Sequence, residues 1–493
     1  MSFSNHTLIL KNDGTLWGCG NNSYGQLGLG DTTNRTTFTQ ITTNTDNIKS
    51  VYCGYSYTLI LKNDGTLWGS GYNGYGQLGL GDTTNRTTFT KITVNTDNIK
   101  SVHYGCHCIF VLKNDGTLYG CGANNYGQLG LGDKSNRTVL TQITTNTDNI
   151  KSIYCGYNHT IVLKNNDTLW GSGRNDAGQL GLGDIINRST FTQITTNTNN
   201  IKLIYCGNEY TIILKNDSTL WGCGYNQYCQ LGLGDATYKS IFTIIGINSG
   251  DIKEVCPGGA HIFILKNDGT LWGCGLHGSG QLGLGSTSAE NVNIFTQITT
   301  NVNDIKSIYG GYNHTIMLKN DGTLWGSGDN QYGQLGLGNT SNRNTFTQIT
   351  NNVNNVKYFA NDYNIPSTIK IYDSKIGYIE TLNTNNFRNI SINSIKTLKV
   401  LYVKPSGTLI SCIVSFDQKQ TWKSFNGTNW VNITDSSPQN IILNCMDIEK
   451  LNQLDKNKLM SGGFTGDLDF KIAIKSNDTK KTPSVTKICI EYK

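Results

Sequence analysis

Long apolar runs and basic tracts are both missing from this 493-residue chain. Its apolar runs are only as long as a β-strand, so we expect no segment that inserts into a membrane. The formal net charge of +6 is small for the length, which argues against a nucleic-acid partner. The opening residues, Met1-Ser-Phe-Ser-Asn5, have no basic start, so no signal peptide is predicted.

Proline is also scarce, with 5 residues, whereas glycine is abundant, with 57. A composition rich in glycine, asparagine and threonine can accompany disorder. The glycines of this chain return at fixed positions, however, so they indicate turns. The length exceeds that of one ordinary core, which favours one large architecture with an additional domain.

One pentapeptide organises the sequence. Gln26-Leu-Gly-Leu-Gly30 recurs six times, at spacings of 51 residues and, in the last case, 53: at Gln77, Gln128, Gln179, Gln230, Gln281 and Gln334. A period near 50 with several short strands in each unit is typical of a β-propeller or a solenoid.

Each repeat is predicted to hold four strands, which the second repeat places at 48–53, 57–62, 66–69 and 88–92. Between the second and third strands, Asn63-Asp-Gly65 predicts a tight turn, because glycine supplies the positive φ that such a turn needs. The third strand carries one large ring per repeat, which we interpret as a packing layer between blades: Trp17, Trp68, Tyr119, Trp170, Trp221, Trp272 and Trp325.

The ring of repeats is expected to close through its last segment. Repeat one begins at His6 without a first strand, and the missing piece follows the seventh repeat, at residues 356–361. Pairing of this segment beside the first repeat would remove the open sheet edges of a linear array. The sequence therefore predicts an all-β fold in which residues 1–363 form a seven-bladed β-propeller.

The repeats resemble a known family. Cys155-Gly-Tyr-Asn-His-Thr-Ile-Val-Leu163 and Thr66-Leu-Trp-Gly-Ser-Gly-Tyr-Asn-Gly-Tyr-Gly-Gln-Leu-Gly-Leu-Gly-Asp82 are similar to units of the regulator of chromosome condensation repeat family. The resemblance implies a seven-bladed propeller. The functions it implies are diverse: nucleotide exchange on a small GTPase, parts of ubiquitin ligases, and secreted bacterial inhibitors of β-lactamases. What such proteins share is a face that binds another macromolecule.

Residues 366–493 leave the repeat and are predicted to form a β-sandwich with one short helix at 446–454. Ser415-Phe-Asp-Gln-Lys-Gln-Thr-Trp422 is similar to the Asp-box turn of sialidases, which is a structural turn, although Lys419 replaces its usual glycine. The following Phe425-Asn-Gly-Thr-Asn-Trp430 resembles the C-terminal β domains of prophage tail proteins from Gram-positive bacteria. This domain is therefore a candidate attachment to a larger assembly.

No catalytic residue, metal site or cofactor is predicted. Gly69-x-Gly71-x-x-Gly74 has the spacing of a dinucleotide fingerprint, but it does not open a helix after a parallel strand. The histidines and cysteines within residues 103–108 suggest zinc, yet no second ligand pair lies at a fitting distance, which favours an ordinary turn. No nucleophile–base or paired-carboxylate arrangement recurs.

The cysteines and most histidines occupy interchangeable repeat positions. Cys19, Cys121, Cys223 and Cys274 share a position that is serine in the other repeats, so we expect reduced thiols rather than disulfides. A second position holds histidine, tyrosine or cysteine, which indicates a residue that packs a turn: His6, Tyr57, Cys108, His159, Tyr210, His261 and His314.

Near-identical repeats differ most in their loops. Successive strands alternate in direction, so the turn between strands one and two and the loop between strands three and four emerge on the same face. Variable side chains there suit recognition, the alternative being neutral drift of solvated loops. The predicted binding residues are Tyr55, Tyr72, Tyr157, Arg174, Tyr225, Tyr312 and Asp329. Tyr363 is expected to continue the turn series.

A second ring of cations follows the glycine-rich loop. It is suited either to an anionic polymer or to a structural bond with a neighbouring blade, and the latter is favoured. The ring comprises Arg35, Arg86, Arg137, Arg188, Lys239 and Arg343.

Two functions fit these observations. The first is a non-enzymatic protein that recognises a protein or a cell-surface glycan, in the setting of a phage tail or a bacterial surface. The second is an intracellular exchange factor for a GTPase, or an interaction scaffold. The resemblance implies that such exchange factors use an inserted wedge, whereas the spacing of these repeats grows only once, by two residues near Glu290. A glycosidase is disfavoured, because no carboxylate pair is present.

Overall fold

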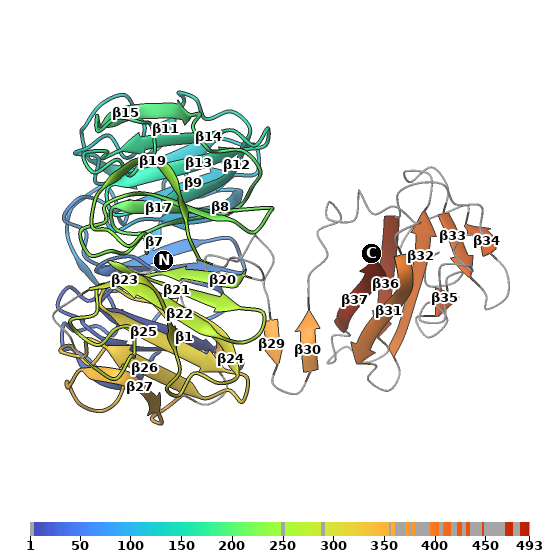
Figure 1. Cartoon of the computed structure of the whole chain (residues 1–493). Helices are drawn as coiled ribbons and strands as arrows, with labels where there is room; N and C mark the ends of the chain where they lie inside the picture. Colours follow the sequence, from blue (N-terminus) through green and yellow to red (C-terminus); the bar gives the residue numbers. More distant parts are fainter. Residues whose placement is uncertain are drawn as a thin grey trace. The chain divides into compact units, whose positions relative to one another are not determined.

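The computed structural model describes residues 4–247, 252–286, 291–353 and 356–359, and nine strands within 371–492. The chain divides into two compact units, Met1–Tyr363 and Asn364–Lys493 (Figure 1). Every described element is a β-strand, so the described residues contain no helix that is long and apolar enough to cross a membrane.

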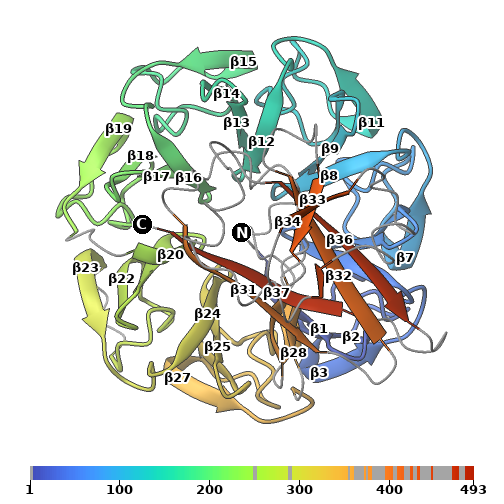
Figure 2. The ribbon, with the colours of Figure 1, turned by 90° about the vertical axis from the view of Figure 1, so that its right-hand side faces the viewer.

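The first unit contains seven four-stranded antiparallel sheets, which confirms the predicted seven-bladed propeller. Figure 2 shows the blades around one axis, with first strands such as β12, β16 and β20 nearest the axis and fourth strands such as β15 and β19 at the rim.

In each blade the four strands pair in the order given. Blade 1 contains β28 (Val356–Phe359), β1 (His6–Lys11), β2 (Leu16–Gly20) and β3 (Arg35–Ile41). Blade 2 contains β4 (Ile48–Cys53), β5 (Tyr57–Lys62), β6 (Leu67–Gly71) and β7 (Arg86–Ile92). Blade 3 contains β8 (Ile99–Tyr104), β9 (Cys108–Lys113), β10 (Leu118–Gly122) and β11 (Arg137–Ile143). Blade 4 contains β12 (Ile150–Cys155), β13 (His159–Lys164), β14 (Leu169–Gly173) and β15 (Arg188–Ile194).

The remaining blades repeat this plan. Blade 5 contains β16 (Ile201–Cys206), β17 (Tyr210–Lys215), β18 (Leu220–Gly224) and β19 (Lys239–Ile245). Blade 6 contains β20 (Ile252–Pro257), β21 (His261–Lys266), β22 (Leu271–Gly275) and β23 (Val292–Ile298). Blade 7 contains β24 (Ile305–Gly310), β25 (His314–Lys319), β26 (Leu324–Gly328) and β27 (Arg343–Ile349).

Blade 1 draws its strands from both ends of the propeller sequence. The strand β28 runs antiparallel to β1, with Tyr358 opposite Leu10 and Phe359 opposite Ile9. The first strand of the blade thus comes from the end of the repeats, beside the strand that begins them (Figure 2). A ring joined in this way has no blade at an open end.

The glycine-rich pentapeptide ties each blade to the next. Leu27 is fully buried, and the main-chain nitrogen of Gly30 donates to the carbonyl oxygen of Thr87 in the next blade at 2.8 Å. Gly28 has a φ of +70°, and a Cβ atom there would lie 2.6 Å from the ring of Phe89. Only glycine permits this conformation and this approach together.

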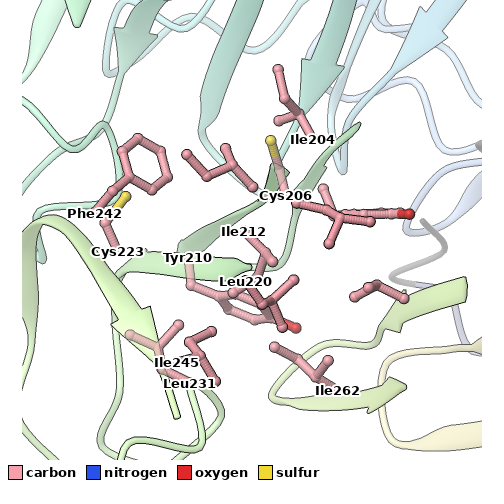
Figure 3. Close-up of a cluster of buried hydrophobic side chains, with 14 of the residues drawn as sticks. Ile204, Cys206, Tyr210, Ile212, Leu220, Cys223, Leu231, Phe242, Ile245 and Ile262 are labelled. Carbon is pink, nitrogen blue, oxygen red and sulfur yellow. The ribbon is translucent and has the colours of Figure 1, made fainter. Parts of the chain in front are cut away.

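The core consists of apolar layers between adjacent blades. Figure 3 shows one such layer around blade 5, where Tyr210, Leu220 and Phe242 pack with Ile262 of blade 6. The third-strand rings join these layers, as predicted, but they are only half-buried. Trp68 packs against residues of blades 1 and 2, while the Lys62 ammonium lies 4.5 Å from its ring centre.

The second unit contains the remaining strands. One sheet pairs β31 (Ile395–Val403) with β37 (Ser484–Tyr492), and a hairpin pairs β29 (Ile371–Asp373) with β30 (Ile376–Ile379). A five-stranded sheet contains β32 (Thr408–Ser415), β33 (Trp422–Phe425), β34 (Trp430–Ile433), β35 (Met446–Asp447) and β36 (Asp469–Ser476). Packing of these sheets as a sandwich remains a prediction.

The helix predicted at 446–454 is wrong at its start. Met446 and Asp447 form β35 and pair with Cys412 and Ser411 of β32. Pairing with a strand distant in sequence has prevailed over a local helical pattern, as tertiary context often does. The rest of that segment lies outside the described residues.

Candidate binding face

The turns between first and second strands meet around the propeller axis. The main-chain nitrogen of Tyr157 donates to the carbonyl oxygen of Asn208 at 2.9 Å, and that of Tyr55 donates to Cys106 at 3.3 Å. Gly259 donates in the same way to Gly311, at 3.1 Å. Each bond joins the turn of one blade to that of the next blade, so the turns form a fixed platform. We call this side of the ring the tyrosine face.

A buried polar layer supports this platform. A Cβ atom on Gly156, which opens the turn of blade 4, would lie 2.1 Å from Cε1 of His159, so the imidazole requires glycine above it. His159 is only 1% exposed, and its Nε2 lies 3.1 Å from Oγ1 of Thr211 in blade 5. Burial lowers the pKa of His159 to about 3, so the imidazole is neutral at physiological pH.

Three of the predicted binding residues meet on the platform. The ring centre of Tyr55 lies 5.7 Å from that of Tyr312 and 6.2 Å from that of Tyr157, and both pairs are edge-to-face. All three rings are half-buried. We call them the axial tyrosines. Burial raises the pKa of Tyr157 well above its ordinary value, so its hydroxyl remains protonated.

His107 extends this cluster towards blades 1 and 2. Its ring lies 5.6 Å from Tyr55 and 5.1 Å from Tyr75. Tyr75 in turn lies 5.9 Å from Tyr72, and Tyr72 lies 4.9 Å from Tyr24. A continuous aromatic stripe therefore crosses part of the face in the order Tyr312, Tyr55, His107, Tyr75, Tyr72, Tyr24. Aromatic rings held by such packing lose little side-chain entropy on binding.

Arg174 belongs to a charged group at the loops of blades 3 to 5. Its guanidinium pairs with Asp176 at 2.8 Å, contacts Glu209 of blade 5, and lies 5.4 Å from the ring centre of Tyr126 in blade 3. Burial raises the pKa of Glu209, and Arg174 opposes that shift. From blade 4, Arg174 thus contacts residues of blades 3 and 5, and its guanidinium pairs with two carboxylates.

Tyr225 and Asp329 have different environments. Tyr225 lies in a separate aromatic patch, 4.9 Å from Tyr238 and 5.8 Å from Tyr228, and its hydroxyl donates to Gln227 at 2.6 Å. Asp329 is only 5% exposed, and its carboxylate accepts hydrogen bonds from the main chain and side chain of Gln331. The structure therefore does not bring Tyr225 and Asp329 into the stripe. Tyr363 lies outside the described residues.

The cation ring is structural in a way that the sequence analysis did not predict. Nη2 of Arg35 lies 2.6 Å from Oδ2 of Asp31, in the same loop and not in a neighbouring blade. The expectation of an inter-blade bond was wrong, because Asp31 lies one turn of the loop away and is within reach. The same loop pair occurs at Arg86–Asp82, Arg137–Asp133, Arg188–Asp184 and Lys239–Asp235.

The described cysteines of the propeller, like most of its histidines, have the environment of packed interior side chains. The cysteines within its described residues are free and buried. Over the same residues, no three His, Cys, Asp or Glu side chains gather as a metal ion would require. His103 instead lies 2.9 Å from the Ser101 hydroxyl.

Sequence reasoning missed four members of this face: Tyr24, Tyr75, His107 and Glu209. Tyr24 and Tyr75 occupy a position that is tyrosine in most repeats, so they did not stand out among the variable loop residues. His107 and Glu209 share a position with Ser56, Asn158 and Asn313. Variation at that turn position was the available signal.

Fold and face together define a seven-bladed propeller that is built from one repeated unit and carries an aromatic platform. The RCC1-like domain matches residues 2–246, and the regulator of chromosome condensation (RCC1) repeat matches residues 268–318 and 321–361. The ultraviolet-B receptor UVR8 of Arabidopsis thaliana is 30% identical over 353 residues, which cover 69% of this chain and 79% of the receptor. The chain belongs to the RCC1 repeat family, as the resemblance predicted.

Other relatives are larger proteins. The X-linked retinitis pigmentosa GTPase regulator of Mus musculus is 31% identical over 48% of this chain, and the match spans 29% of the regulator. Among solved structures, yeast RCC1 (Prp20) bound to Kap60 superposes with a TM-score of 0.62 at 19% identity, over 72% of this chain and 86% of that one. Human WBSCR16 gives a TM-score of 0.59 at 22% identity, over 70% and 94%. At these identities, the two structures show the fold alone.

Proposed function

We propose that this chain is a non-enzymatic binding protein that recognises a protein partner through the aromatic stripe of its tyrosine face. The observation that carries the proposal is the meeting of Tyr55, Tyr157 and Tyr312 on a platform of bonded turns. Large rings that are held rigidly and remain half-exposed are typical of the energetic centres of protein interfaces. The solved relative Prp20 is described with the proteins Kap60, Gsp1p and histones, which supports a protein partner.

A selection followed by crosslinking tests this proposal. The full-length chain is immobilised and used to select binders from a random-sequence peptide library. Benzoylphenylalanine is then placed at Tyr72, within the stripe, and at Val94, an exposed residue on the opposite face, in separate proteins. We expect selected peptides to crosslink to position 72 and not to position 94. Crosslinking at position 94 alone would place the binding surface elsewhere and contradict the proposal.

A surface glycan is the second candidate ligand, because residues 425–430 resemble phage tail parts and the loops of the tyrosine face carry amide side chains such as Asn21, Asn158 and Gln227. A phage tail or a bacterial surface is the setting that this reading implies. Screening the same protein on a glycan array separates the two ligand classes. Glycan binding that competes with every selected peptide would favour the glycan, whereas no glycan binding would leave the protein partner.

Nucleotide exchange on a GTPase is the alternative activity. Its test is the release of labelled nucleotide from a panel of small GTPases in the presence of the full-length chain. We expect release at the spontaneous rate, because the repeats contain no insertion longer than two residues. Accelerated release would favour the exchange factor over the binding protein.

A further inference from the structure

On the basis of the proposed function, we infer that the partner presents an arginine- or lysine-bearing segment, whose cation lies between the axial tyrosines and the carboxylates around Arg174. Such a segment would bring positive charge to a part of the propeller where aromatic rings lie near two carboxylates that share one guanidinium.

Cations lie over aromatic rings on both sides of the propeller, but in different numbers. On the side opposite the tyrosine face, a lysine lies over the third-strand ring of every blade, at distances of 3.9–4.9 Å between the ammonium nitrogen and the ring centre. On the tyrosine face, Arg174 over Tyr126 is the one such pair among the described residues. The rings of the stripe therefore have quadrupole faces that no described cation occupies, and these favour an incoming cation.

The charges near the axis have the same preference. Within the described residues, the turns and loop starts of the tyrosine face carry one cation, Arg174, and three carboxylates, Asp176, Glu209 and Asp329. One guanidinium against three carboxylates gives these described side chains a formal charge of −2. The arginines farther out have an aspartate of their own in blades 1 to 4, so they do not reverse this local balance.

Glu209 is a carboxylate that would be stabilised by a second cation. Its side chain is 23% exposed and contacts Arg174, yet burial still raises its pKa. The charged form of this carboxylate is thus incompletely compensated, and a guanidinium or ammonium from a partner would stabilise it. Asp176, whose side chain is 46% exposed, is accessible beside it.

Three matched peptides test the inference. Each is a fluorescein-labelled 12-residue peptide in which serine alternates with arginine, with citrulline or with glutamate; citrulline keeps the shape of arginine without its charge. Fluorescence anisotropy with the full-length chain is measured at 50 and at 150 mM salt. We expect the arginine peptide to bind at least about tenfold more tightly than the citrulline peptide, with weaker binding at the higher salt. Equal affinity for all three peptides would overturn the inference.

Charge substitutions locate the effect. Glu209→Gln with Asp176→Asn is expected to weaken binding of the arginine peptide at least about fivefold. The matched control, Asp64→Asn with Asp115→Asn, removes two exposed carboxylates from turns on the opposite face and should leave the affinity unchanged. Equal loss in both double variants would show a nonspecific attraction and overturn the inference.

Substitution of Arg174 should change the affinity for the arginine peptide in the opposite direction. Arg174→Gln frees both carboxylates, so we expect the arginine peptide to bind more tightly. Weaker binding would mean that Arg174 itself contacts the ligand, and would overturn the inference. Spermine at equal charge is the competitor that separates a polypeptide ligand from a diffusible cation, and full displacement by spermine would contradict the polypeptide. A selected peptide that is neutral but crosslinks at position 72 would leave the proposed function intact and overturn the basic segment alone.

Discussion

Nε2 of His6 in blade 1 lies 3.0 Å from Oγ1 of Thr58 in blade 2. The Thr58 hydroxyl donates to the carbonyl oxygen of Gln26 at 2.7 Å, so the imidazole Nε2–H donates to the hydroxyl oxygen. Nδ1 of His6 is buried and has no partner. The same pair joins later blades, at His159–Thr211, His261–Thr315 and His314–Thr7.

Where the next blade lacks this threonine, the histidine is absent as well. Tyr57 precedes a blade with Ile109 in the threonine position, and Tyr210 precedes a blade with Ile262. The Tyr57 hydroxyl donates instead to the carbonyl oxygens of Gly105 and Cys108, at 2.8 and 2.9 Å. Histidine thus accompanies threonine, and tyrosine accompanies isoleucine, because each ring needs an acceptor in the neighbouring blade.

This pairing predicts a rescue between neighbouring blades. Tyr57→His loses the hydroxyl bond and places a buried imidazole against Ile109, which should cost about 1–3 kcal/mol of unfolding free energy. Adding Ile109→Thr restores an acceptor, so the double variant should regain much of that loss. Thermal unfolding of the two single variants and the double variant measures the coupling. Additive losses would contradict the pairing.

Because several histidines are buried, we predict that the free energy of unfolding falls on acidification, already at pH values above those at which carboxylates titrate. The pKa of His159 is about 3 in the folded chain and 6.5 ordinarily, so the unfolded chain binds the proton first. The contribution of each such histidine to the free energy of unfolding should be fully present above pH 6.5. It should be lost as the pH falls towards 3, by about 1.4 kcal/mol per pH unit. His6, His261 and His314 act in the same direction.

The matched variant for this effect is His159→Gln, which retains a donor for Thr211. Urea unfolding at intervals from pH 4.5 to 6 should show a slope of stability against pH that is smaller by about 1.4 kcal/mol per unit than in the parent chain. An unchanged slope would mean that His159 is already charged in the folded chain.

The Lys62 ammonium lies over the Trp68 ring, and we expect this contact to contribute modestly to the free energy of unfolding. The ammonium lies 4.5 Å from the ring centre and 2.8 Å from the carboxylate of Asp46, whose side chain is 70% exposed. The ion pair is therefore screened, and Lys62→Met should cost about 1 kcal/mol, mostly from the lost ring contact. Lys91→Met, in the exposed fourth strand of the same blade, is the control. Equal melting temperatures for the two variants would contradict this contribution.

The pairing of β28 with β1 predicts that the late segment stabilises the whole ring. Successive main-chain N–H groups of a strand point to opposite sides, so proline at both Tyr358 and Phe359 removes a donor towards β1. We expect a loss on the order of 2–3 kcal/mol, whereas alanine at both positions keeps the main-chain bonds. Calorimetry compares the two double variants. If they melt together, the ring does not depend on this ladder.

The repeat made most of the fold predictable. Each blade repeats the same turn glycine, ring and pentapeptide, so the sheets follow from local chemistry that the sequence states seven times. The axial tyrosines could be placed on one face for the same reason. Their contacts could not be predicted, because Tyr55, Tyr157 and Tyr312 meet only through the curvature of the ring.

Other features depended on contacts that repeat comparison does not reveal. Arg35 was expected to reach another blade, yet Asp31 satisfies it within the loop. Asp329 was predicted on the recognition surface, and its carboxylate bonds within its own loop. Met446 and Asp447 follow a local helical pattern, yet they pair with a distant strand.

The most direct test of the binding face is the equilibrium affinity of the strongest selected peptide for the chain that carries Tyr55→Ser and Tyr157→Ser. Isothermal titration calorimetry should show binding at least about tenfold weaker than that of the parent chain, or about 1.4 kcal/mol, because hot-spot rings carry most of the binding energy. Val94→Ser, on the opposite face, should bind like the parent. If the double variant melts at the parent temperature and binds within about twofold of the parent, a difference too small for such rings, the tyrosine face is not the binding surface.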